Sequence, residues 1–456
     1  MQVNWQQFGL KANPYDTLPL AEGGGLSLKD AFIGRESERN TLDALFGLEN
    51  NVCLTVCGDT GVGKTSLANY QKLIWKQREK SALFSCRREI EATDTLLDKR
   101  NFLLEIIGSV LREIELIDSR LLKDPLLFRL NQLVNLTQSL TLSGSVSGEM
   151  YGFGAGVSFS RDRNSALPEK LTMASLEQSF SYLLDFIKTK TIGDCRYVGL
   201  VVHVNNFDVI LEEKNGLEKV KHFFHEVRDF LQTRDVYFLF LGPENFYGSV
   251  IAAEQRVKSI FVRTPIMVKP LSKREVICAF EKRMELLKSE GVVRSIKPIP
   301  DEVISQLYDL YEGDIRSIMT SMKAILEQCG DRLLQPLTKD ESLVLLGRER
   351  WERIESSLTK EQKNILRFLV ENNADINAKK ASDILKKPAS NISGYYFKPL
   401  KDLGILEEKR REKKMVYFGL TAEYEPLRWW MESQKRMERG EGSIAGKQRG
   451  LFDGLH

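Results

Sequence analysis

The sequence predicts an α/β protein with a parallel β-sheet core, followed by a helical segment and a small C-terminal domain. Three observations lead to this fold class. Short apolar runs rich in β-branched residues alternate with helical patterns between residues 52 and 268. A glycine-rich turn joins the first of these runs to a helix. After residue 357 the pattern changes to three short helices and two strands joined by a charged turn.

The composition is that of a globular chain with more than one domain. Its 456 residues are 42% apolar and 28% charged. The net charge is only +3, so any surface for nucleic acid must be a local patch. The six cysteines form no CxxC pair, which argues against a zinc site or a disulfide framework. The N-terminus does not read as a signal peptide and no run has membrane-spanning length, so we expect a cytoplasmic protein without membrane contact.

The strongest motif is a phosphate-binding loop. Val52–Cys57 reads as a buried strand, Gly58–Thr65 spells G-x-x-x-x-G-K-T, and a helix follows. Glycines let backbone amides curl around phosphate oxygens, Lys64 reaches the β- and γ-phosphates, and Thr65 ligates Mg²⁺. The motif therefore predicts that ATP and Mg²⁺ are bound by Gly58, Asp59, Thr60, Gly61, Val62, Gly63, Lys64, Thr65 and Ser66.

Further strands and helices are expected downstream of this loop. Apolar runs predict strands over 82–86, 197–204, 236–241 and 266–268. Apolar residues at helical spacing predict helices over 176–188 and 217–232. Their alternation favours a parallel sheet.

Four further motifs, in order along the chain, carry a family resemblance. They are AFIGRESERNTL (31–42), FLGPEN (240–245), EQRVKSIF (254–261) and YEGDIRSIM (311–319). With these motifs the chain resembles AAA+ ATPases of the origin-recognition initiator type and the related STAND signalling ATPases. The resemblance implies that Asn245 senses the nucleotide, that Arg256 contacts a neighbouring subunit's γ-phosphate, and that Arg316 acts from a helical lid. The alternative is that both arginines are solvated surface charges and Asn245 is a turn residue.

The resemblance places the two Walker B carboxylates at Asn205 and Asn206. Asparagine can orient a water on Mg²⁺ next to Thr65, but it brings no charge and cannot accept a proton. Losing a general base costs about 10²- to 10⁴-fold in rate. Asp208 is a candidate replacement if the strand continues, and otherwise caps the next element. We expect ATP to bind and hydrolysis to be slow or partner-stimulated.

The sequence predicts six segments. The expected order is an N-terminal extension (1–30), the AAA+ core (31–270), a helical lid (271–330), a linker helix (331–356), a winged helix (357–430) and a disordered tail (431–456). The core carries an insertion over about residues 90–172. Its glycine- and serine-rich part, 141–163, predicts a β-hairpin or a mobile loop, either partner-contacting or ornamental.

The winged helix is expected to bind duplex DNA. Its third helix, begun by a capping Ser390, would enter the major groove, and the basic wing would contact phosphates. Three acidic residues, Glu407, Glu408 and Glu412, lower the net positive charge of the wing. The alternative is therefore a winged helix that contacts protein. The candidate DNA-binding residues are Ser390, Asn391, Ser393, Tyr395, Tyr396, Lys398, Lys409, Arg410, Arg411, Lys413 and Lys414.

The C-terminal tail contains QRGLF, which resembles the Q-x-x-L-F peptide that docks bacterial proteins on the replication sliding clamp. The resemblance implies that Gln448, Leu451 and Phe452 contact such a clamp. Three matching positions in a polar tail also arise by chance.

Three functions fit these patterns. The first is an ATP-switched DNA-binding protein of the initiator, loader or target-selector type, which self-assembles through Arg256. The second is a STAND-like signalling or defence module whose winged helix contacts protein. The third is a catalytically weak structural subunit of a hetero-complex with an active ATPase.

Overall fold

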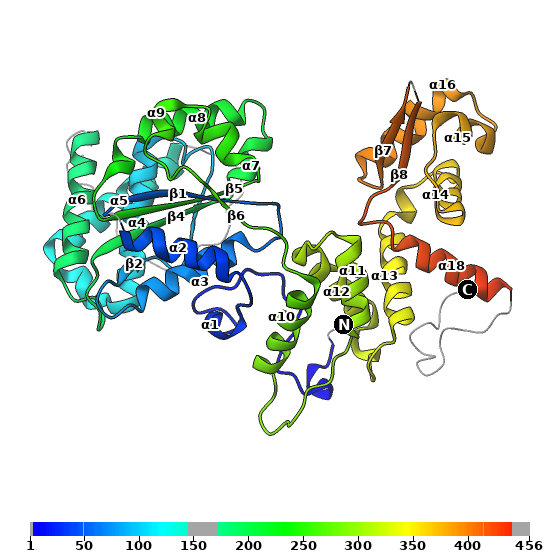
Figure 1. The fold of residues 1–456 in the computed structure, drawn as a ribbon, viewed down its shortest axis with the longest axis horizontal. Helices are drawn as coiled ribbons and strands as arrows, with labels where there is room; N and C mark the ends of the chain where they lie inside the picture. The colour runs from blue at the N-terminus through cyan, green and yellow to red at the C-terminus, as the bar shows by residue number, and fades with distance from the viewer. Residues whose placement is uncertain (1–2, 49, 145–171, 414, 440–456) are drawn as a thin grey trace. The chain divides into compact units, whose positions relative to one another are not determined.

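The computed structural model describes residues 3–48, 50–144, 172–413 and 415–439. The chain forms two compact units (Figure 1). Pro19–Lys269 make up the first, here called the P-loop unit. The chain up to Leu18 and from Pro270 onward makes up the second, here called the helical unit. No helix among the described residues has the length and apolar character needed to cross a membrane.

The P-loop unit contains one parallel sheet, as predicted. The strand order is β2-β4-β5-β1-β6, and β3 also pairs with β4. Every pair within this sheet is parallel. The four predicted runs and the strand before the glycine-rich loop all form strands. The strands are β1 (Val52–Cys57), β2 (Leu83–Ser85), β3 (Ile90–Glu91), β4 (Gly199–Asn205), β5 (Val236–Gly242) and β6 (Ile266–Met267).

The edge of the sheet next to β4 is made in two pieces. β2 pairs with residues 199–201 of β4, and β3 pairs with Val204 and Asn205. The backbone leaves the sheet between them, over residues 86–89. Sequence patterns predicted only the first piece, because a two-residue strand is too short to show periodicity.

Helices cover both faces of this sheet (Figure 1). One face packs on α2 (Glu36–Leu48) and α3 (Lys64–Lys76) through a cluster that includes Leu54, Leu67 and Trp75. The other face carries a phenylalanine-rich core, and its helices include the predicted 176–188 and 217–232 segments. The helices on that side are α4 (Lys99–Asp118), α5 (Pro125–Gly144), α6 (Met173–Thr189), α7 (Phe207–Glu212), α8 (Gly216–Val227) and α9 (Gln255–Lys258).

The described first part of the insertion belongs to the core of the P-loop unit. It contains β3, α4 and α5, and Phe102, Ile107 and Ile114 of α4 are fully buried. Most of the glycine-rich stretch over 141–163 lies outside the described residues.

The helical unit begins with four helices, α10 (Lys273–Leu286), α11 (Asp301–Leu310), α12 (Ile315–Cys329) and α13 (Lys339–Ile354). The N-terminal residues pack on them, which corrects the single extension expected over 1–30. Buried Arg283 of α10 donates a hydrogen bond to the Asp16 carbonyl at 2.8 Å, and Tyr15 is fully buried beside Phe280. Residues 19–30, which include the first three residues of α1 (Leu28–Ala31), belong to the P-loop unit instead.

The winged-helix pattern is present in the structure. Its elements are α14 (Lys360–Asn372), α15 (Ala378–Leu385), α16 (Ala389–Ile392), α17 (Lys398–Asp402), β7 (Leu406–Glu412) and β8 (Met415–Leu420). A π-helical turn over Ser393–Phe397 joins α16 to α17. The predicted serine cap is wrong, because Pro388 holds the N-cap position and Ser390 lies inside the helix. Pro388 presets an extended backbone there without a side-chain cap.

The expected disordered tail is also wrong over its first part. Leu427–Glu438 forms α18, which contributes Leu427 to the winged-helix core and packs Trp430 against Gly347 of α13. The charged residues that made this segment look disordered lie on the exposed side of an amphipathic helix. Residues 440–456, with Gln448, Leu451 and Phe452, and also Lys414, lie outside the described residues.

Candidate nucleotide site

The glycine-rich loop connects β1 to α3 in the conformation that a phosphate needs. Gly61 and Gly63 have positive φ angles of 82° and 96°, which favour glycine. A Cβ on Gly58 would lie 2.4 Å from the Val268 carbonyl oxygen. The loop ends at the N-terminus of α3, whose backbone N–H groups and dipole favour an anion.

Two of the predicted nucleotide-binding residues, Lys64 and Ser66, lie in the first turn of α3, directly after the glycines of the loop. Lys64 is buried, and its Nζ donates hydrogen bonds of 2.8 Å to the carbonyls of Gly58 and Asp59. The loop thus holds a cation where phosphate oxygens would meet it. Ser66 Oγ accepts a 3.3 Å hydrogen bond from Leu20 N–H, so this side chain also ties the N-terminal segment to α3.

Asn205 contacts the loop directly. It is the last residue of β4, its side chain is buried, and its Nδ2 donates a 3.0 Å hydrogen bond to Thr65 Oγ1. The structure therefore brings Asn205 and Thr65 together. Asn206 differs: it has a left-handed conformation, with φ 67°, and forms the N-cap of α7. Asparagine tolerates that conformation better than most residues.

Two further candidates, Asp208 and Asn245, follow the carboxyl ends of β4 and β5 and do not lie within a strand. Asp208 lies in the first turn of α7, half-buried, so it does not share a strand face with Asn206 as one alternative required. Asn245 is exposed in the turn after β5, where its carbonyl accepts hydrogen bonds from the backbone and side chain of Ser249. Because β5 pairs with both β1 and β4, that turn lies at the same sheet edge as the loop.

The donor set suits Mg²⁺ carried in by a nucleotide. The Thr65 hydroxyl is available as one ligand, and the neutral Asn205 amide can hold a metal-bound water. Among the described residues there is no cluster of three or more His, Cys, Asp or Glu side chains that would hold a metal. Binding of Mg²⁺ would therefore depend on phosphate oxygens.

Arg35 is a site-supporting residue that the motif search passed over. It lies in the 31–42 segment with φ 68° and is buried. Its guanidinium donates a 2.6 Å hydrogen bond to the Val62 carbonyl of the loop, and it also contacts the Lys269 carbonyl and Glu38. Arg35 thus ties the loop to the last residue of the P-loop unit. Only its place in the AFIGRE motif pointed to it.

A buried polar layer lies behind Asn205 on the α3 side of the sheet. His203 of β4 is buried, and its ring nitrogens have no hydrogen-bond partner among the described residues. Burial, and to a lesser extent the nearby Lys72 charge, lowers the pKa of His203 well below its usual value. Burial also lowers the pKa of Lys72 to about 8. Lys72 Nζ donates a 2.9 Å hydrogen bond to the Cys86 carbonyl. Sequence offered no signal for this layer beyond polar residues at apolar positions.

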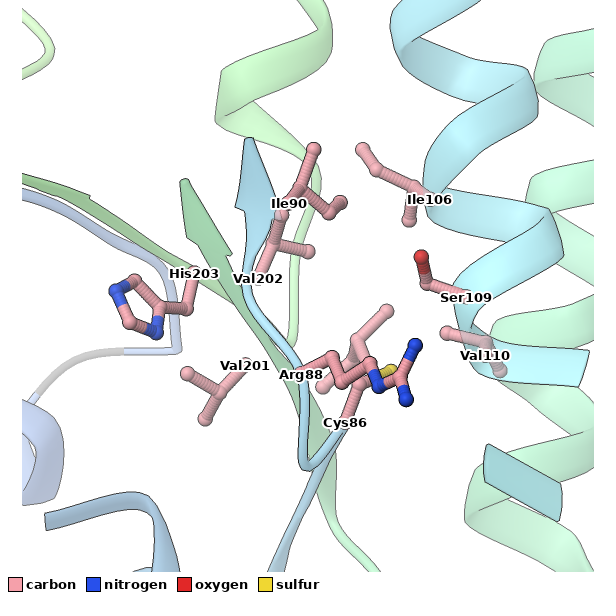
Figure 2. A pocket seen from close by; sticks show the side chains of 10 residues that line it. Cys86, Arg88, Ile90, Ile106, Ser109, Val110, Val201, Val202 and His203 are labelled. Atoms are coloured by element: carbon pink, nitrogen blue, oxygen red, sulfur yellow. The ribbon is translucent and has the colours of Figure 1, made fainter. Parts of the chain in front are cut away.

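A cavity beside β4 is too small to bind a nucleotide. It lies between β4, the 86–90 bend and α4, and has room for about one water molecule. Figure 2 shows Val202 directed toward Ile106 of α4, while His203 is directed to the other side of the strand. The candidate nucleotide site is therefore the loop with Asn205, and not this cavity.

The two candidate arginines lie away from the loop in the sequence and in different units. Arg256 is exposed on α9, and its carbonyl accepts a 3.1 Å hydrogen bond from Arg228 Nε. Arg316 is exposed in the first turn of α12 in the helical unit, where its backbone N–H is capped by Asp314. Their contact with a nucleotide stays a prediction.

The winged helix presents most of its candidate residues to solvent. Tyr395 is 73% exposed, and Ser390, Asn391, Ser393 and Lys398 are exposed beside it. Tyr396 is instead half-buried against the winged-helix core, because it lies on the inner side of the π-helical turn. Its contact with DNA stays a prediction, and only part of its side chain is accessible.

The basic wing is paired with its own acidic residues. Lys409 contacts Glu407, Arg411 contacts Glu408 at 3.0 Å, and Arg410 contacts Glu412 at 3.0 Å. Arg410 also stacks on Tyr417, 4.4 Å from the ring centroid. Lys413, at the turn, has no ion pair among the described residues. The wing is exposed but close to charge balance.

Solved structures of several proteins resemble this chain, among them the following three. The Aeropyrum pernix ORC1 protein in complex with DNA is 13% identical, over 90% of this chain and 95% of that chain, with a TM-score of 0.43. The Aeropyrum pernix ORC2 protein, in ADPNP–ADP complexes, is 15% identical over 95% and 100%, with a TM-score of 0.48. The Thermotoga maritima RuvB branch migration motor is 12% identical over 86% and 95%, with a TM-score of 0.37. No family model and no curated protein sequence matches the chain. The chain is thus structurally similar, over most of its length, to ORC and RuvB proteins.

Proposed function

We propose that this protein is an ATP-binding switch of the AAA+ initiator type, which engages duplex DNA through its winged helix and hydrolyses ATP slowly or with a partner's help. The glycine-rich loop binds ATP with Mg²⁺, and the bound nucleotide sets the state of the helical unit. Candidate sensing residues are Asn245 and Arg316, and self-assembly would use Arg256.

The hydrogen bond between Asn205 and Thr65 is the observation that carries this proposal. It joins Thr65, the residue that would ligate Mg²⁺, to the end of the β4 strand, where P-loop NTPases carry the Walker B aspartate that also holds Mg²⁺. The residue at that strand end is neutral, so the site holds phosphate through Lys64 and backbone amides with little added negative charge. Tight ATP retention with slow turnover is the expected result.

DNA engagement rests on the exposed face of the third helix. Tyr395, Lys398 and the serines beside it form a polar, cationic surface on an element that suits the major groove. The helix, more than the paired wing, supplies the free donors. DNA affinity should therefore depend on Lys398 and Tyr395 and fall as salt rises.

The test combines ATP binding with single-turnover hydrolysis, with and without duplex DNA. We expect ATP to bind in both conditions, hydrolysis to be slow alone, and DNA binding to weaken in Tyr395→Ala/Lys398→Ala. The matched control is Lys379→Ala on α15, an exposed lysine outside the third helix. Absence of ATP binding, or DNA binding equal in all three proteins, contradicts the proposal.

The paired wing favours a second candidate function. Because its cations are neutralised by Glu407, Glu408 and Glu412, this surface also suits a protein partner, as in a STAND-like module or a subunit of a hetero-complex. Copurification of a homologous active ATPase, together with no measurable DNA affinity at low salt, would favour this function. Docking of Gln448, Leu451 and Phe452 on a sliding clamp stays a prediction, tested by removing residues 440–456.

A further inference from the structure

We infer that Glu91 replaces the missing Walker B carboxylate and is the general base for ATP hydrolysis. This inference rests on the proposed function, because it assigns a residue to the slow hydrolysis at the same site. No sequence motif singled out Glu91. Only the pairing of β3 with β4 brings it to the end of the strand that carries Asn205.

The register of the two strands sets the position of Glu91. In the parallel pair, Ile90 lies beside Val204 and Glu91 lies beside Asn205. Neighbouring residues in register point to the same face of a sheet. Ile90 and Val204 both enter the phenylalanine-rich core on one face. Glu91 and Asn205 therefore share the opposite face, where Asn205 meets Thr65 of the phosphate loop.

The backbone holds this register at the site itself. The N–H of Ala92 donates a 2.8 Å hydrogen bond to the Asn205 carbonyl, immediately after Glu91. Ile90 and Ala92 on either side of Glu91 are buried, so the residue cannot move far along the strand. Adjacent strands are about 4.8 Å apart, a distance that a glutamate side chain can span.

The carboxylate of Glu91 is free to act. It is exposed and has no hydrogen bond or ion pair with any residue that the structure describes. Nearby Arg88 and Glu89 belong to the bend before β3 and not to the strand pair.

The other acidic residues at this sheet edge are placed less favourably. Asp208 lies in the first turn of α7, beyond the left-handed Asn206. Asp59 is an exposed loop residue whose carbonyl accepts from Lys64, and Glu244 is exposed in the turn after β5. Of these carboxylates, Glu91 is the one that stands beside Asn205 in the sheet.

The chemical step needs no further reactant besides ATP and water. A water held near Asn205 loses a proton to the Glu91 carboxylate while its oxygen bonds to the γ-phosphorus. The bond between that phosphorus and the β–γ bridging oxygen breaks, and ADP leaves with the bonding electron pair. The protonated Glu91 then returns its proton to solvent. Asn205 orients the water, and Lys64 stabilises the phosphate charge.

The experiment compares Glu91→Gln with Asp208→Asn in the full-length protein. Glutamine keeps the size of the side chain and removes its basicity. We expect single-turnover hydrolysis to fall about 10²- to 10⁴-fold in Glu91→Gln and to change less than about threefold in Asp208→Asn. The nucleotide recovered from Glu91→Gln after incubation should be ATP, where the unmodified protein yields ADP.

A binding measurement separates this inference from the proposed function. The affinity of Glu91→Gln for a non-hydrolysable ATP analogue with Mg²⁺ should stay within about twofold of the unmodified protein, because Glu91 acts in the chemical step. If ATP binds and Glu91→Gln hydrolyses it normally, or the unmodified protein hydrolyses none with or without DNA, Glu91 is not the base although the switch proposal survives. If ATP does not bind, the proposed function itself fails.

Discussion

Charged and polar side chains are buried at the phosphate-loop site but exposed on the wing of the winged helix. At the site, polar groups are buried and each is held in one place, as Asn205 is by Thr65 and Lys64 is by the loop carbonyls. On the wing, charges are exposed and pair with one another, as Arg411 does with Glu408. Buried polar contacts lose far more when broken than exposed ion pairs do. A substitution at the site should therefore be costly, while the wing should tolerate one.

Among effects on binding and stability, the largest is expected from Lys64→Ala. This change removes the buried cation and the hydrogen bonds that it would donate to phosphate oxygens, each worth about 1.5–3 kcal/mol because the donor is charged. ATP affinity should fall about 100-fold, measured by titration with a fluorescent ATP analogue. Lys80→Ala, an exposed lysine after α3, is the control and should bind as before. If both variants bound ATP with similar affinity, the glycine-rich loop would not be the ATP-binding site.

The next largest effect is expected on the stability of the helical unit. Gly347 of α13 approaches α18 so closely that an added Cβ would lie 2.3 Å from the Pro426 carbonyl oxygen. Gly347→Ala should lower the free energy of unfolding of the helical unit by about 1–3 kcal/mol, because backbone must move. Denaturant unfolding measures this. Gly394→Ala, where an added Cβ has no neighbour within 4 Å in the described part of the chain, should be neutral or stabilising. An equal loss in both variants would contradict the close packing.

A pH-dependent effect is expected from the buried His203. Burial lowers its pKa in the folded protein, so below pH about 6.5 the unfolded chain binds a proton that the folded protein does not. Stability should therefore fall as pH drops below that value, by up to about 1.4 kcal/mol per pH unit. His203→Leu should remove this part of the slope, while His225→Gln, exposed on α8, should keep it. Parallel pH profiles for His203→Leu and the unmodified protein would show that His203 does not titrate in this way.

The smallest effect is expected on the wing. Each exposed ion pair is worth less than about 1 kcal/mol, so neutralising the acidic partners costs little stability. The triple variant Glu407→Gln/Glu408→Gln/Glu412→Gln should instead raise DNA affinity and steepen its salt dependence, because three cations become available to phosphates. Fluorescence anisotropy over a salt series measures both. An unchanged affinity would favour the protein-contacting wing.

The fold class was readable from the sequence because its signals are local. A buried parallel strand is a continuous apolar run, and the glycine-rich loop needs glycines at positions such as Gly61 and Gly63. The winged helix likewise showed its helical periods. The predictions from sequence missed or misassigned elements where the hydrophobic periodicity was too short or was masked by charged residues. The two-residue β3 shows no periodicity, and the charged face of α18 hid an amphipathic helix that buries Leu427.

The amino-acid sequence by itself determined the glycine-rich loop and the order of strands and helices along the chain. It also determined that the neutral residues Asn205 and Asn206 follow one another at the end of a strand. Only the tertiary structure decided which residues stand next to them. Strand pairing is a non-local choice set by burial on both faces of the sheet, so no spacing in the sequence could place Glu91 beside Asn205. The same holds for Arg35, which reaches the Val62 carbonyl 27 positions away. Local composition specifies elements, whereas packing between distant segments specifies the site.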